Sequence, residues 1–200
     1  MTTSPAPTIR PTTPTDEARW KELFRAYREF YRLEPSEEIV SRVWSWLTDP
    51  AHECQGLVAE ADGSIVGIAD YRRFSRPSTG SVGIWLDDLF TDPEARGRGV
   101  GRALISRLQS IAASEGCSVV RWITADDNAQ AQVLYDDVAT KTNWLTYDAK
   151  PTESLALSCR VRKGRARWSG KNRQAQRTPV LTARCFCAAC CGRAKGRPRH

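Results

Sequence analysis

The sequence has few histidines and no long apolar run. His52 and His200 are its two histidines, and neither lies near other residues that would complete a metal site. No apolar run reaches the roughly 18 residues that a membrane-spanning helix needs. The segment Met1–Pro14 is rich in Thr and Pro and lacks the apolar stretch of a secretion signal. We therefore expect a soluble, cytoplasmic protein.

The first three quarters of the chain contain few cysteines and no excess of positive charge. Of seven cysteines, Cys54 and Cys117 precede residue 150, and an odd total without a secretion signal argues against a disulfide framework. Residues 1–150 carry 17 basic and 22 acidic side chains, whereas residues 151–200 carry 13 basic and 1 acidic. The net charge of +7 therefore reflects the C-terminal quarter and does not mark the whole chain as nucleic-acid-binding.

The C-terminal quarter has the composition of a disordered extension, with high net charge and few apolar residues. Its clustered cysteines lack a second Cys/His pair at zinc-finger distance, and Trp168 is the one aromatic residue in its basic stretch. The abrupt change of composition also resembles an altered reading frame. We predict one domain over residues 1–150, extended by an edge strand to 161 if that segment pairs, and a basic, cysteine-containing, disordered tail over 162–200 without a metal.

Hydrophobic periodicity predicts an α/β arrangement. Apolar residues spaced by three and four indicate helices, alternating or continuous apolar runs indicate strands, and Ala61-Asp62-Gly63 marks a hairpin turn. The predicted order is one strand, two helices, three strands, helix, strand, helix and strand, with a largely antiparallel first half. The first predicted helix ends near Arg32, and the other three cover 35–47, 100–114 and 129–138. The predicted strands cover 8–10, 56–60, 64–71, 81–90, 118–124 and 143–147.

The strongest chemical signal is a glycine-rich turn between a strand and a helix, within Leu86–Leu104. Backbone N–H groups at a helix N-terminus are unpaired and carry partial positive charge, so they bind phosphate. Glycine lets that backbone approach a ligand closely, and Arg96, Arg98 and Arg102 add charge. A dinucleotide fold or a P-loop would use a similar turn. The Gly-Lys-Ser/Thr of a P-loop is missing, however, and a hairpin rather than a βαβ unit precedes the turn.

Two motifs in this part of the chain resemble those of the GNAT acetyltransferases. Arg96-x-x-Gly99-x-Gly101 matches the pyrophosphate loop of that family, and 127–135 resembles its second motif, Asn-x-x-Ala-x-x-Leu-Tyr. The segment 136–147 is similar to the ending of the branch that includes yeast histone and polyamine acetyltransferases, although Trp144 stands where Phe is usual. The resemblance covers about residues 8–150. It implies a GNAT fold, which is an α/β fold with a mixed central sheet flanked by helices. The first half of that sheet is antiparallel, and a splayed parallel pair of strands lies at the cofactor site.

The resemblance also implies an N-acetyltransferase that moves the acetyl group of acetyl-CoA to a primary amine, on a small molecule or a lysine, by direct attack. The amine must be neutral to attack, so a strand carboxylate, Asp87 or Asp88, would remove its proton. These two lie on opposite faces of the strand, and the sequence leaves the choice open. Tyr135 would protonate the leaving thiolate. The residues implied to hold acetyl-CoA are Leu89, Phe90, Thr91, Arg96, Gly97, Arg98, Gly99, Val100, Gly101, Arg102 and Asn128, the last of which would also cap its helix.

A non-enzymatic function is the alternative. The domain would then bind CoA and deliver the basic tail to nucleic acid. Asn128 and Tyr135, both present, favour the enzyme. The expected partners are acetyl-CoA and an amine, with no membrane and no required metal, and a homodimer stays open. Polyamine, free amino acid, antibiotic amine and protein lysine all remain candidate acceptors.

Overall fold

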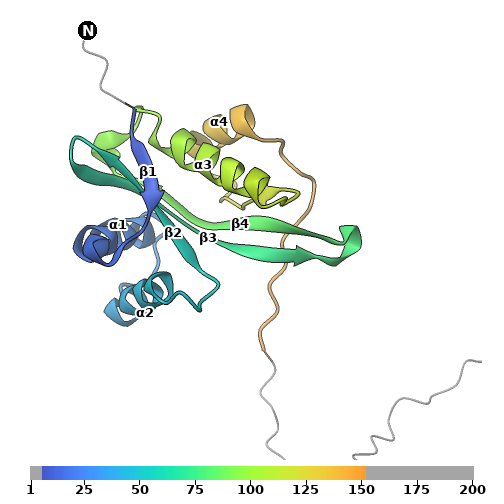
Figure 1. The fold of residues 1–200 in the computed structure, drawn as a ribbon, viewed down its shortest axis with the longest axis horizontal. Coiled ribbons are helices and arrows are strands. Elements are labelled where there is room, and N and C mark those ends of the chain that lie inside the picture. Colours follow the sequence, from blue (N-terminus) through green and yellow to red (C-terminus); the bar gives the residue numbers. More distant parts are fainter. Residues whose placement is uncertain (1–5, 152–200) are drawn as a thin grey trace, which may run out of the picture. The chain divides into compact units, whose positions relative to one another are not determined.

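The computed structural model describes residues 6–151, which form a five-stranded sheet with helices on both faces (Figure 1). The strands follow one another in the order of the sequence. The first four are antiparallel, and the last is parallel to its neighbour. This confirms the predicted mixed sheet. The strands are β1 (Thr8–Pro11), β2 (Gln55–Ala61), β3 (Ser64–Arg76), β4 (Ser81–Thr91) and β5 (Val120–Arg121).

Two pairs of helices cover the two faces of the sheet (Figure 1). Helices α1 (Glu17–Phe30) and α2 (Glu37–Thr48) enclose one core, and α3 (Val100–Ser114) and α4 (Ala129–Val138) pack on the other. Proline opens each of three short 3₁₀ turns, η1 (Pro14–Asp16), η2 (Pro77–Thr79) and η3 (Pro93–Ala95), because its fixed φ suits a first helical position. Trp20, Phe24, Val40, Ile68 and Phe90 are in the first core, and Leu57, Ile84, Leu104, Ile105 and Leu108 are in the second.

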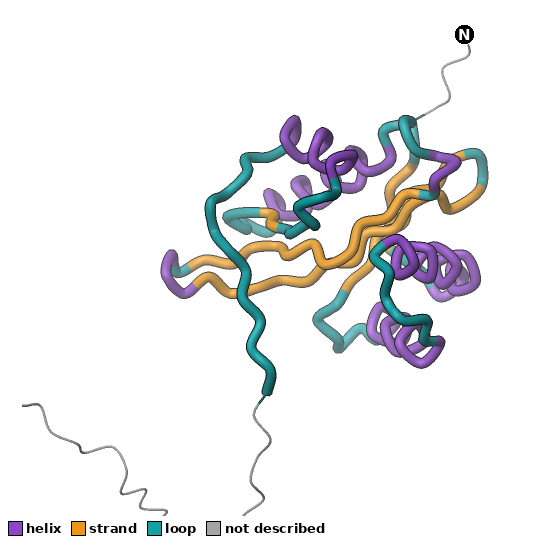
Figure 2. The backbone as a smooth tube through the Cα atoms, turned by 180° about the vertical axis from the view of Figure 1, so that it is seen from behind, coloured by secondary structure: helices purple, strands orange, loops and turns teal. Residues whose placement is uncertain are grey.

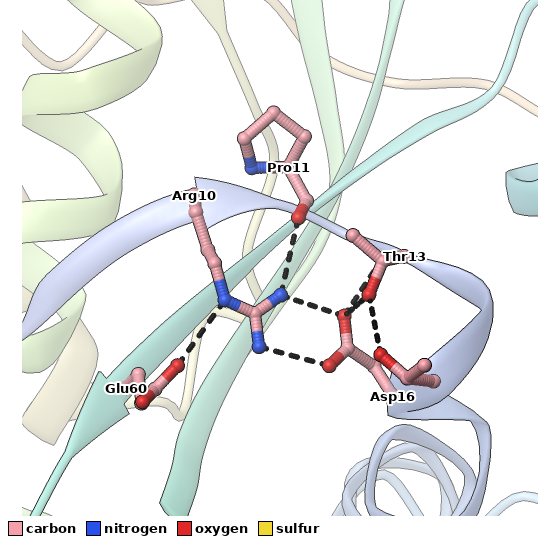
Figure 3. Close-up of polar contacts among 6 residues, drawn as sticks. Arg10, Pro11, Thr13, Asp16 and Glu60 are labelled. Carbon is pink, nitrogen blue, oxygen red and sulfur yellow. Dashed lines mark hydrogen bonds and ion pairs between the residues drawn. The ribbon is translucent and has the colours of Figure 1, made fainter. Parts of the chain in front are cut away.

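An ion-pair cluster joins the N-terminal strand to the start of α1 (Figure 3). The guanidinium of Arg10 donates two hydrogen bonds to Asp16, at 2.7 and 2.9 Å, and a third to Glu60 of β2 at 3.2 Å. Asp16 also accepts from the backbone N–H and the hydroxyl of Thr13, at 2.7 and 2.9 Å. This cluster holds β1, η1 and β2 together, and so fixes where α1 leaves the sheet.

Strand β4 is irregular where the two candidate aspartates lie. Asp70 of β3 stands opposite Asp88, and the next pair joins Tyr71 to Leu86. Asp87 is therefore the extra residue of a β-bulge, which bends its strand and interrupts the ladder. Figure 2 shows β3 and β4 as a long hairpin that extends beyond the other strands.

The parallel pair β4 and β5 is short. It is formed at Ile84 and Trp85 alone, just before the bulge, while β4 continues to Thr91. The two strands therefore separate beyond this point, as the predicted splayed pair requires. The predicted strand 118–124 was too long, because the segment after Arg121 has no ladder to join once β4 bends away.

The predicted strand over 143–147 was wrong. Residues 140–151 form no regular element, and Trp144, Leu145 and Tyr147 are 81%, 77% and 85% exposed. A strand needs a paired neighbour and a buried face, and within the described residues this segment has neither. The suggested edge strand up to 161 and the tail over 162–200 lie outside the described residues. No helix within residues 6–151 is both long enough and apolar enough to cross a membrane.

Candidate active site

A cavity of about 400 Å³ lies beside the end of β4. Its walls come from the end of α1, the end of β4, the glycine-rich loop with the start of α3, and the start of α4. The volume is typical of a small-molecule site. The structure brings together in these walls most of the residues predicted from the sequence, namely Leu89, Phe90, Thr91, Arg96, Gly97, Gly99, Val100, Gly101, Arg102, Asn128 and Tyr135.

Three predicted site residues lie outside these walls. Arg98 is exposed and donates to Asp62 at 2.7 Å, so its side chain is engaged with the β2–β3 turn. Asp87 and Asp88 also do not line the cavity. They lie earlier on β4, at and next to the bulge. Any catalytic contact that the two aspartates make must therefore occur beside this cavity rather than inside it.

The glycine-rich loop adopts a backbone that requires glycine at two positions. Gly97 and Gly99 have φ values of +75° and +79°, which side-chain-bearing residues rarely adopt. Gly99 is the N-cap of α3, so the N–H groups of the helix's first turn have no partner inside the helix. Gly101 packs against α4, since a methyl group there would lie 3.1 Å from Leu134 Cδ2. The loop thus offers open backbone donors with no side chain above them, which fits a pyrophosphate.

Arg96 lies against aromatic rings at the mouth of this loop. Its guanidinium carbon is 5.8 Å from the ring centre of Phe30 and 5.9 Å from that of Phe90. Its Nε donates to the carbonyl of Thr91 at 3.4 Å. Cation–π contacts of this kind orient the side chain while leaving its outer N–H groups free to bind an anion. On the other side of the loop, Arg102 forms an ion pair with Asp137.

Tyr135 brings a phenol into the cavity. Its ring packs edge-on against Trp122, with ring centres 5.3 Å apart. Burial raises the pKa of Tyr135 to about 12, so the hydroxyl keeps its proton at neutral pH. The side chain therefore meets the requirement for a proton donor.

Asn128 forms the predicted cap of α4. Its Oδ1 accepts from the backbone N–H of Ala131 at 3.4 Å. Its Nδ2 lies 3.2 Å from the hydroxyl of Thr124 and 3.4 Å from that of Tyr31. The cap is confirmed, and the contact with the cofactor stays a prediction. These bonds tie α4 to the end of α1 across the cavity.

The two candidate aspartates differ in their surroundings. Asp87 is at the surface and pairs with Arg72, whose Nε is 3.3 Å from Oδ2. Asp88 is half-buried, and burial raises its pKa above the ordinary value. The Tyr27 hydroxyl and the positive charge of Arg28 act in the opposite direction and favour the charged form of Asp88. Although Asp87 is at the surface, partial burial of its side chain also raises its pKa, against the effect of Arg72.

Tyr27 connects Asp88 to the cavity. Its ring centre is 5.1 Å from that of Tyr31 and 6.4 Å from that of Phe90, and both of these residues line the cavity. Burial, followed by the nearby charge of Asp88, raises the pKa of Tyr27, so its hydroxyl remains protonated beside Asp88. Asp88 therefore lies one side chain away from the cavity wall.

Sequence reasoning missed several residues of this site. Phe30 and Tyr31 were assigned to a helix by their spacing, but their position in the cavity wall depends on how α1 packs against β4. Tyr27 of the same helix was missed for the same reason, and Asp70 was missed because only the register of β3 against β4 places it opposite Asp88. The one available signal was that Asp70 interrupts the apolar run Ile65–Tyr71, where a charged residue is unusual.

Comparison with known proteins decides the family. The family model described as "Acetyltransferase (GNAT) family" matches residues 20–138. The chain belongs to this family. GNAT acetyltransferases use acetyl-CoA, and structures of family members with CoA bound are among the structural neighbours of this chain. The mixed sheet with its splayed parallel pair is the GNAT fold.

Relatives of this GNAT chain act on different amines, as their names state. The D-amino-acid N-acetyltransferase HPA3 of Saccharomyces cerevisiae is 31% identical over 136 residues, which cover 67% of this chain and 84% of that protein. The thialysine N-epsilon-acetyltransferase of Bos taurus is 35% identical over 125 residues, covering 56% and 71%. The structure of the aminoglycoside N-acetyltransferase AAC(6')-Iy in complex with CoA aligns with a TM-score of 0.61 at 22% identity, covering 73% of this chain and 95% of that one. At that identity the likeness shows the fold alone.

Proposed function

We propose that this protein transfers the acetyl group of acetyl-CoA to a primary amine by direct attack of the amine. The observation that carries the proposal is that one cavity holds both the open N–H groups at the start of α3 and the protonated hydroxyl of Tyr135. A module that only bound CoA would need the first feature and not the second. The relatives support an amine acceptor and leave its identity open.

The glycine-rich loop and the end of β4 bind and orient the cosubstrate in this proposal. Acetyl-CoA supplies an acetyl group activated as a thioester. The first-turn N–H groups after Gly99 hold the pyrophosphate, and Arg96 adds a cation that its aromatic neighbours orient. The β4–β5 ladder ends at Trp85, so within the described residues the edge of β4 from Leu89 to Thr91 has no strand partner on that side. Its free backbone groups there bind the pantetheine arm in this proposal.

Asp88 is the proposed base. An ammonium group must lose a proton before its nitrogen attacks, and a base works best when its pKa lies near the working pH. Half-burial moves the pKa of Asp88 in that direction, and Tyr27 places it next to the cavity wall. Asp87 is the weaker candidate because its charge is already paired with Arg72 at the surface. Tyr135 then donates a proton to the departing thiolate.

Release of free thiol from acetyl-CoA, measured with a panel of amines, tests the proposal. The panel should include D-amino acids, polyamines, aminoglycosides and lysine peptides. In the Tyr135→Phe variant the ring still packs against Trp122, but the proton donor is gone. We expect kcat to fall about 10²–10⁴-fold, the range typical of a lost general acid, with CoA affinity nearly unchanged. Binding of CoA without acceleration by any amine would point instead to the non-catalytic alternative.

Gly99→Asp tests the position of the cosubstrate. A carboxylate at this N-cap would face the pyrophosphate, and aspartate is strained at a φ of +79°. We expect CoA affinity to fall tenfold or more, or about 1.4 kcal/mol. Gly80→Asp is the matched control, because Gly80 also has a positive φ but lies in η2–β4, away from the cavity. Equal CoA affinity of a folded Gly99→Asp variant and its control would contradict the assignment.

A further inference from the structure

Three neighbouring strands place a glycine and two aspartates in one row. Gly56 of β2 is opposite Asp70 of β3, and Asp70 is opposite Asp88 of β4. Residues directly opposite one another on antiparallel strands point to the same face, with Cβ atoms about 5 Å apart. Ile68 and Phe90, two positions away on the same strands, belong to the core under α1 and α2. The two carboxyl groups therefore face each other beneath these helices.

Asp70 is completely buried, and within residues 6–151 neither of its carboxyl oxygens has a hydrogen-bond partner. The space that it occupies exists because of Gly56. A methyl group at Gly56 would lie 3.3 Å from Asp70 Oδ1 and 2.5 Å from the Thr12 hydroxyl oxygen. Burying a carboxyl group without partners is costly, and an apolar side chain would serve packing better. A requirement other than packing therefore explains its position.

The charges around the pair are distributed unevenly. Tyr27 and Arg28 of α1 act on Asp88 and favour its charged form. The indole N–H of Trp20 lies near Asp70 and favours its charged form, although the two groups do not meet hydrogen-bond geometry, while Asp88 and Asp87 oppose that charge. Cys54, just before β2, also senses the charges of these aspartates, and burial raises the pKa of its thiol to about 12, so it stays neutral. Asp70 is thus the site in this row where a proton is held most strongly.

We infer that Asp70 and Asp88 form one acid–base unit that binds a single shared proton, in which Asp70 is a positioning residue that makes Asp88 a stronger base. This inference rests on the proposed role of Asp88. Two carboxylates that face each other repel, and one proton relieves that repulsion, so the unit takes up its proton more readily than a lone aspartate does.

The proton transfer balances within this unit. The N–H bond of the acceptor ammonium breaks, and its electron pair stays on nitrogen, which becomes the nucleophile. The unit begins this step with both carboxylates charged. An O–H bond forms on Asp88, the proton is then shared with Asp70, and the charge of the unit falls from two negative to one. The shared proton later leaves to water. Burial raises the pKa of Asp70 well above its ordinary value, and the nearby charge of Asp88 raises it further, which is the interaction that couples the two carboxyl groups.

Carbon-13 NMR of the aspartate carboxyl groups in the full chain tests the unit without any need for activity. In the native protein we expect Asp70 and Asp88 to titrate together in two steps more than about one pH unit apart. In Asp70→Asn, Asp88 should titrate in one step below the upper step of the pair. Asp16→Asn removes another buried carboxyl and should leave both steps unchanged. An Asp88 titration identical in the native protein and Asp70→Asn would overturn the inference.

The pH profile of kcat, at saturating acetyl-CoA and amine, tests the consequence for catalysis. In Asp70→Asn we expect the acid limb to move to lower pH by about one unit, because the upper step of the pair is gone. The plateau should fall about tenfold, less than for loss of the base itself. A merely structural role would lower the plateau and leave the limb in place, which would contradict the inference.

If Asp70→Asn folds poorly, Asp70→Ala removes the same charge and must show the same shift. A native protein that acetylates no amine would defeat the proposed function, while the NMR titration would still decide whether the unit exists.

Discussion

Two buried aspartates of this protein have opposite environments. Asp16 is 5% exposed and accepts four hydrogen bonds from Arg10 and Thr13, at 2.7 to 2.9 Å (Figure 3). Asp70 is 0% exposed, and in the described part of the chain its carboxyl group accepts none. The first aspartate lies where the chain enters α1, and the second lies in the middle of the sheet beside the proposed base.

The consequences for the two carboxyl groups are also opposite. Arg10 lowers the pKa of Asp16 to about 2, against the effect of burial. Burial raises the pKa of Asp70 well above its usual range. A carboxyl group that has partners stabilises the fold when charged, whereas one without partners costs stability when charged. The comparison agrees with a structural role for Asp16 and with the proposed acid–base role of Asp70.

The largest effect is expected at Asp88, which stands opposite Asp70. Asp88→Asn should reduce kcat about 10²–10⁴-fold because the proposed base is lost. Asp87→Asn is the matched control one residue away, and a change of less than about threefold is expected from a surface carboxylate paired with Arg72. Steady-state thiol release measures both. The reverse order of effects would assign the base to Asp87 and separate the catalytic centre from Asp70.

Asp16→Asn should destabilise the fold by about 2 kcal/mol, since a pKa shift of one unit corresponds to about 1.4 kcal/mol. The figure is an upper value, because Arg10 is 33% exposed and water screens the pair. Urea unfolding at pH 7 measures the change. The kcat of the folded protein should stay as in the native chain, and a loss of kcat would show that the cluster also shapes the active site.

Asp70→Asn should change stability in the other direction. The substitution keeps the shape of the side chain and removes the charge that is costly to bury, so the free energy of unfolding at pH 8 should rise by about 1 kcal/mol or more. The same urea unfolding experiment measures it. A clear loss of stability would mean that Asp70 has partners in solution that offset its burial, and the contrast with Asp16 would disappear.

The pH dependence of unfolding is the finest test of the contrast. Asp70 has a raised pKa, so the stability that it contributes is fully present below its ordinary pKa near 4 and is lost as pH rises through the raised value. Asp16 has a lowered pKa, so its contribution is present above about pH 4 and is lost as pH falls through about 2. In Asp70→Asn the free energy of unfolding should fall less steeply as pH rises above 4. In Asp16→Asn it should fall less steeply as pH drops below 4. Native-like slopes in both variants would refute the two assignments.

Local sequence was sufficient to predict the glycine-rich turn and the helix that follows it. Helix α3 begins at Val100, as predicted. Its N-cap residue has a left-handed backbone, which glycine adopts without strain, and Gly99 occupies that position. Asn128 predicted the start of α4 through its cap, and both ends of that helix agree with the prediction. The strand predicted over 143–147 failed because a strand depends on a neighbour elsewhere in the chain, which local apolar residues do not specify.

The sequence by itself contained the motifs that resemble the family, and it determined the glycine-rich turn and the starts of α3 and α4, because these local features depend on backbone preferences within a few neighbouring residues. The tertiary structure decided which aspartate is buried and which is exposed, since the bulge at Asp87 sets the direction of each side chain. It also decided that Asp70 and Asp88, 18 positions apart in the numbering, face each other beneath Tyr27. Strand register and helix packing are long-range properties, so the acidity of these groups follows from the fold and not from their place in the chain.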